Sequence, residues 1–119
     1  MDIDLKRLVE DLIAVFKMHS NKTWTSVKSS AEKYSIDLAE QTNMILRSRI
    51  AGSLRYNEDQ FNKRMKEVKD QAKNYAQLLV ARTVKAIEEL WNALVAVLWD
   101  AVNKALDKAG LSFLKVPVG

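Results

Sequence analysis

The chain has 119 residues, 48% apolar and 29% charged, with a formal net charge of +4. This balance is typical of one folded domain, residues 1–119. Three Gly and one Pro are too few for a protein of many strands, and the absence of Cys excludes disulfides and thiolate chemistry. The start Met-Asp-Ile-Asp lacks the basic residues of a secretion signal. The longest apolar run, Ala93 to Trp99, is seven residues, whereas a membrane span needs about 20. We therefore expect an all-α protein in the cytoplasm or in a particle.

The first predicted helix covers about residues 3–18. Leu5, Leu8, Leu12 and Val15 recur at helical spacing and form one apolar face. Asp2 or Asp4 can cap the first turn. The segment 19–21, His-Ser-Asn, favours a break, because Ser and Asn side chains compete for nearby backbone groups. A single continuous helix over 3–51 is the alternative.

The second predicted helix covers about residues 23–51. Its apolar stripe follows steps of three and four residues and consists of Trp24, Val27, Ala31, Tyr34, Leu38, Thr42 and Ile45. Gly52 and Ser53 favour an end or a kink. Asn57 then resembles an N-cap, with Gln60 in the position of a capping box. We therefore predict a turn within 52–57 and an antiparallel helical hairpin.

The third predicted helix is very long, covering about residues 58–109, because no Gly or Pro lies within that range. Its first half repeats every 3.5 residues on average, through Phe61, Met65, Val68, Ala72, Tyr75 and Leu79. If unbroken, it extends for about 78 Å. The stripe changes phase near Arg82, which we interpret as a stutter within the helix. Gly110 is its predicted C′ residue, and the apolar, non-helical tail 111–119 is expected to dock against a neighbour.

These elements predict an elongated antiparallel hairpin or bundle of about three helices. The segment from Leu90 to Val102 is apolar on nearly every side and requires enclosure by protein or lipid. Three helices from one small chain are too few, so we expect a second subunit, or the first helix folded back, to cover it. The predicted oligomer interface comprises Leu90, Trp91, Leu94, Leu98, Trp99, Val102, Phe113 and Leu114. A plain core is the alternative; lipid-surface insertion is less favoured, because the segment lacks a polar face flanked by Lys and Arg.

Basic residues are concentrated in the middle of the chain. Residues 17–85 hold 14 Lys or Arg against 7 Asp or Glu. In a hairpin the second and third helices bring several cations together, and such a patch attracts phosphate backbones through counterion release. The candidate residues are Arg47, Arg49, Arg55, Lys63, Arg64, Lys66, Lys69 and Lys73. A solvated face, neutralised by Glu67, Asp70 and Glu58, is the alternative interpretation.

The sequence predicts no catalytic residue, metal site or cofactor. His19 is the single His, and with no Cys it cannot form a usual zinc site. No glycine-rich phosphate loop and no G-x-S-x-G motif occurs. We therefore expect a non-enzymatic, self-assembling structural protein, such as a coat, filament or scaffold subunit, with itself as partner. The alternatives are a protein that packages DNA or RNA through its basic helical end, and a small helical adaptor with an apolar end that faces a partner or a membrane.

Overall fold

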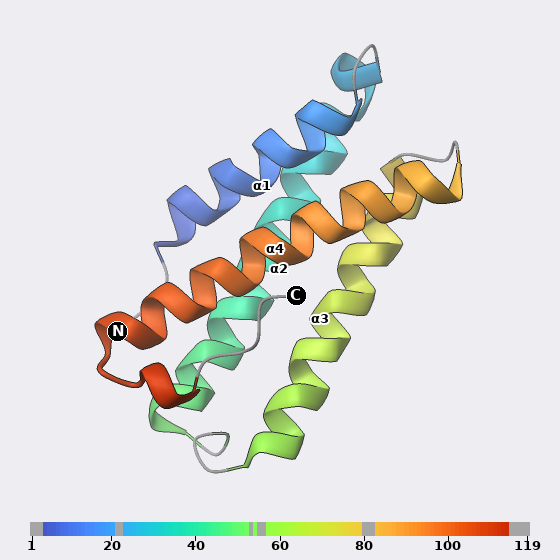
Figure 1. The fold of residues 1–119 in the computed structure, drawn as a ribbon. Helices are drawn as coiled ribbons and strands as arrows, with labels where there is room; N and C mark the ends of the chain where they lie inside the picture. The colour runs from blue at the N-terminus through green and yellow to red at the C-terminus, as the bar shows by residue number, and fades with distance from the viewer. Residues whose placement is uncertain (1–3, 21–22, 53, 55–56, 80–82, 115–119) are drawn as a thin grey trace.

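The computed structural model describes residues 4–20, 23–52, 54, 57–79 and 83–114 (Figure 1). Within these ranges 92% of residues are helical and none lies in a strand, so the prediction of an all-α protein is confirmed. The four α-helices and one short 3₁₀ helix are α1 (Leu5–Ser20), α2 (Trp24–Ala51), α3 (Glu58–Leu79), α4 (Val84–Lys108) and η2 (Ser112–Leu114).

The four α-helices form an antiparallel bundle. Each packs on the next in the chain, and α1 also packs on α4, which closes the bundle (Figure 1). The molecule measures 44 × 26 × 19 Å along its principal axes, which is elongated but much shorter than the helix predicted for residues 58–109. Short connections between antiparallel neighbours are the usual topology of a four-helix bundle.

The prediction of one very long third helix is wrong. α3 ends at Leu79, and a separate helix, α4, begins at Val84. Thr83 is the N-cap of α4, with extended backbone (φ −132°, ψ 156°), and its side-chain oxygen accepts a hydrogen bond from the N–H of Ala86 at 3.1 Å. A helix can begin at a capping residue with extended backbone, such as Thr83, so the chain needs no Gly or Pro to separate α3 from α4. The predicted stutter at Arg82 lies outside the described residues.

Capping hydrogen bonds mark the starts of α1 and α3 and the end of α4. Asp4 and Asn57 accept, through their side-chain oxygens, hydrogen bonds from backbone N–H groups three residues ahead, at 3.2 and 3.1 Å. Gly110 has φ 75°, and the N–H of Leu111 donates to the carbonyl of Leu106 at 2.8 Å, which is a Schellman C-cap. α1 ends at Ser20 and α2 runs back along it, so the alternative of one helix over 3–51 is wrong.

The apolar segment of α4 is enclosed within the same chain. Leu90, Leu94, Leu98 and Val102 have no exposed surface, because α1, α2 and α3 pack around them. Of the two covers expected for this segment, a second subunit or the first helix folded back, the structure shows the second, because α1 packs on α4 while α2 and α3 cover its other sides. In the tail, Leu111 and Leu114 are buried against the bundle, while residues 115–119 lie outside the described residues.

Candidate nucleic-acid interface

Four lysines form a basic stripe on the outer surface of α3. Lys63, Lys66, Lys69 and Lys73 follow at steps of three, three and four residues, and all four are exposed. The opposite face of α3 is anchored in the core by Phe61, Met65, Val68, Ala72 and Ala76. The amphipathic pattern of α3 therefore fixes the basic stripe towards solvent.

Only part of the positive charge on α3 is neutralised. Arg64 lies 3.4 Å from Glu67, and Lys66 lies 2.9 Å from Asp70, and all four side chains are exposed. Exposed pairs of this kind contribute little and are screened by salt. Among the described residues, Lys63, Lys69 and Lys73 form no ion pair. The stripe therefore keeps a net positive charge at neutral pH.

The bundle places Trp91 of α4 against the basic stripe. Its indole N–H donates a hydrogen bond to the backbone carbonyl of Lys69 at 2.9 Å. The ammonium nitrogens of Lys69 and Lys73 lie 5.4 and 4.8 Å from the centroid of its rings, within the range of a cation–π contact. The ring is half-buried. An aromatic group thus interleaves with the cations, which the sequence interpretation missed.

The predicted single helix over 58–109 places Trp91 far from the basic stripe, so the sequence alone does not bring them together. Residues 69 and 91 in one helix are about 33 Å apart. They meet only because the chain reverses between α3 and α4. The sequence signal for this reversal is Thr83. It is a favoured N-cap residue three positions before Ala86, and it lies close to the change of apolar phase near Arg82.

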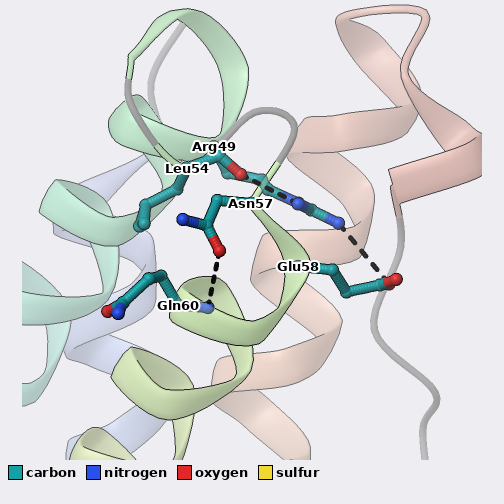
Figure 2. Close-up of polar contacts among 5 residues, drawn as sticks. All are labelled: Arg49, Leu54, Asn57, Glu58 and Gln60. Carbon is teal, nitrogen blue, oxygen red and sulfur yellow. Dashed lines mark hydrogen bonds and ion pairs between the residues drawn. The ribbon is translucent and has the colours of Figure 1, made fainter.

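Arg49 does not lie on the predicted basic surface. Its side chain is 3% exposed, and Nη1 donates to the carbonyl of Leu54 at 2.8 Å (Figure 2). Its Nη2 lies 3.8 Å from a carboxylate oxygen of Glu58, and its guanidinium carbon lies 4.3 Å from the ring centroid of Phe61. Arg49 therefore ties the end of α2 to the start of α3, and phosphates do not reach it. Arg47 is exposed on α2, and Arg55 lies outside the described residues.

The residues predicted as an oligomer interface divide into two groups. Leu90, Leu94, Leu98, Val102 and Leu114 belong to the core of the single chain and present no interface surface. Three others reach the surface: Trp91 and Trp99 are half-buried, and Phe113 is 73% exposed. The structure brings Trp91 to the basic stripe, whereas Phe113 lies at the end of the chain in η2.

A second polar cluster joins α2 to α3. The carboxylate of Asp37 accepts hydrogen bonds from the side-chain amide of Gln41, at 2.7 Å, and from the hydroxyl of Tyr75. The ring of Tyr75 stacks on Tyr34 with centroids 4.1 Å apart. Burial raises the pKa of Tyr75, and the neighbouring Asp37 raises it further. The cluster is a cross-helix tie, which holds α3 and its outer face in register.

The surface of the bundle also carries shallow grooves. One, of about 260 Å³, lies between α1 and α4 and is lined by residues of both charge signs, such as Asp11, Asp100 and Lys104. In the part of the chain that the structure describes, no cluster of three or more His, Cys, Asp or Glu side chains is arranged to hold a metal ion. None of the described helices combines the length and the apolar character that crossing a membrane requires.

Comparison of the chain with protein-family models, with curated proteins and with solved structures gives no match.

Proposed function

We propose that the protein binds the phosphate backbone of nucleic acids, without sequence preference and without catalysis, through the basic stripe and Trp91. The observation that carries this proposal is the group formed by Lys69, Lys73 and Trp91, in which two cations without ion pairs among the described residues lie over an aromatic ring. Contacts of ammonium groups with phosphates position a protein on nucleic acid but read no bases. This role is that of a packaging protein rather than of a sequence-specific regulator.

The strength of such binding follows from the number of cations that reach phosphates. Each neutralised phosphate of duplex DNA adds about 0.9 to the slope of log affinity against log salt. Three lysines of the stripe without ion pairs therefore account for a slope contribution of roughly 2.7. Lys66 and Arg64 exchange their carboxylate partners for phosphates at some cost, so we expect them to contribute less.

A salt titration with matched charge variants tests the proposal. The variant Lys63→Gln, Lys69→Gln, Lys73→Gln removes three charges from the stripe, and the control Lys17→Gln, Lys28→Gln, Lys33→Gln removes three exposed charges from α1 and α2. Fluorescence anisotropy with a labelled duplex is expected to show a smaller salt slope for the stripe variant. The control should keep most of the slope. No binding by the wild type at about 50 mM salt, or an equal loss in both variants, contradicts the proposal.

A second candidate function is that of a subunit of a homo-oligomeric assembly. The observation that favours it is an apolar groove between α1 and α2, where Leu5 and Ile36 are 36% and 45% exposed beside Val9 and Ala39. The rim of the groove carries Lys6, Glu10 and Glu40. In a symmetric dimer, Lys6 of one copy can pair with a glutamate of the second copy.

Sedimentation velocity tests this second candidate, because it measures whether the protein is a monomer or an oligomer in solution. An assembly that forms through the groove should dissociate on Ile36→Glu, because the change places a charge among apolar side chains. The control Met18→Glu changes an exposed residue that does not line the groove. A monomeric wild type at low and high salt contradicts the assembly.

A further inference from the structure

The half-buried ring of Trp91 packs against the core, and its polar edge is satisfied by α3. The indole N–H is fixed by the carbonyl of Lys69, so the ring cannot rotate without losing that hydrogen bond. The ammonium groups of Lys69 and Lys73 lie over the ring. Both lysines are exposed and their ammonium groups are strongly hydrated, so the ring face that they cover is the one towards solvent. Trp91 therefore offers a fixed aromatic face at the surface of the bundle.

A fixed aromatic face that is covered only by two lysine side chains suits an unpaired base. In a single strand, a base can stack on the indole, while Lys69 and Lys73 move from the ring to the flanking phosphates. Aromatic stacking of this kind accepts every base, since every base has a π face. The bases of a duplex are already stacked inside the helix, so a duplex gains only the phosphate contacts.

We propose that the surface formed by Trp91, Lys69 and Lys73 recognises single-stranded nucleic acid in preference to duplex, with Trp91 as the base-stacking platform. This inference rests on the proposed function, because the lysines must first hold the phosphate backbone. It adds the class of nucleic acid and the residue that selects it. Truncation of an aromatic side chain that stacks one base lowers affinity about 5- to 150-fold in proteins that bind single strands.

The experiment compares three ligands of one length, about 15 nucleotides, at about 50 mM salt. They are a single strand, the matching duplex, and an abasic strand that keeps the phosphates and lacks the bases. The wild-type protein is expected to bind the single strand at least 5-fold more tightly than the abasic strand and the duplex. Equal affinity for the single and the abasic strand overturns the inference without any variant. Binding to none of the three overturns the proposed function as well.

Variants then assign the preference to Trp91. Trp91→Leu is expected to lose about 5- to 150-fold in affinity for the single strand and to leave duplex affinity nearly unchanged. Trp91→Phe keeps an aromatic face and should retain most of the affinity, which separates stacking from a loss of folding. Trp99→Leu, at another half-buried Trp of α4, is the matched control and should bind like the wild type. A Trp91→Leu protein that loses single-strand and duplex binding equally, or not at all, contradicts the inference.

Discussion

At the scale of single residues, position in the bundle separates cations that stabilise the fold from cations available for binding. Arg49 lies at the end of α2 near Arg47, yet only Arg49 is buried against Leu54 and Phe61. The sequence shows two arginines of equal chemistry two positions apart. Because neighbours two positions apart point about 200° apart on a helix, only one of them can turn inward, and Arg49 is the one that lies four residues after Ile45 on the apolar stripe of α2.

We predict that Arg49→Gln destabilises the protein by about 2 kcal/mol. The change removes a buried, charge-assisted hydrogen bond to the carbonyl of Leu54 and the contact with the ring of Phe61. Glu58 adds little, because it lies 3.8 Å away and is 77% exposed. Urea denaturation of the variant measures the loss. The control Arg64→Gln removes an exposed pair and should change stability by less than about 0.5 kcal/mol. Equal effects of the two changes would show that Arg49 does not hold the turn.

Ionisation of Tyr75 lowers the stability of the folded protein at alkaline pH. Burial, and then Asp37, raises its pKa in the folded state above the ordinary value of 10.0. The folded protein therefore holds the phenolic proton more tightly than the unfolded chain does. This contribution is fully present below pH 10.0 and is lost as the pH rises through the folded pKa. Chemical denaturation from pH 8 to 11 should show falling stability for the wild type, and a shallower fall for Tyr75→Phe. An identical pH dependence in both proteins contradicts this assignment.

At the scale of secondary structure, the sequence predicts a helix end only where a recognisable capping residue or a Gly marks it. The N-cap at Asn57 and the C′ residue Gly110 were predictable, because each carries a local signal and each is seen in the structure. The sequence does not predict the boundary before α4, because the absence of Gly and Pro there favours one continuous helix. Thr83 ends that continuity through a single side-chain hydrogen bond and extended backbone.

We predict that Thr83→Ala destabilises the protein by about 1 kcal/mol, since the N–H of Ala86 loses its side-chain acceptor. Thr25→Ala is the matched control, because Thr25 is exposed in the first turn of α2 and no cap hydrogen bond depends on it. Thermal unfolding followed by circular dichroism measures both. A control that loses as much stability as Thr83→Ala would refute the capping role.

At the scale of the whole molecule, the bundle explains both the enclosure of α4 and the candidate site. The lysines of the site could be predicted from sequence, because they lie on one exposed face of one helix. Trp91 could not, because its contact with Lys69 crosses from α4 to α3 and depends on the reversal between them. The sequence predicts the buried leucines of α4 as an interface for the same reason, because one helix over 58–109 leaves one helix too few to cover them.

The fold and the candidate site both depend on α3 and α4 being two packed antiparallel helices of one chain. A distance between spin labels at Asn62→Cys and Asp100→Cys tests it directly, because both positions are exposed and the chain has no Cys of its own. Labelled protein is diluted with unlabelled protein so that only distances within one molecule are measured. In the antiparallel bundle the distance should be less than half of the value for one helix. In one continuous helix these residues, 38 positions apart, are separated by about 57 Å, and that result would contradict the fold and the site built on it.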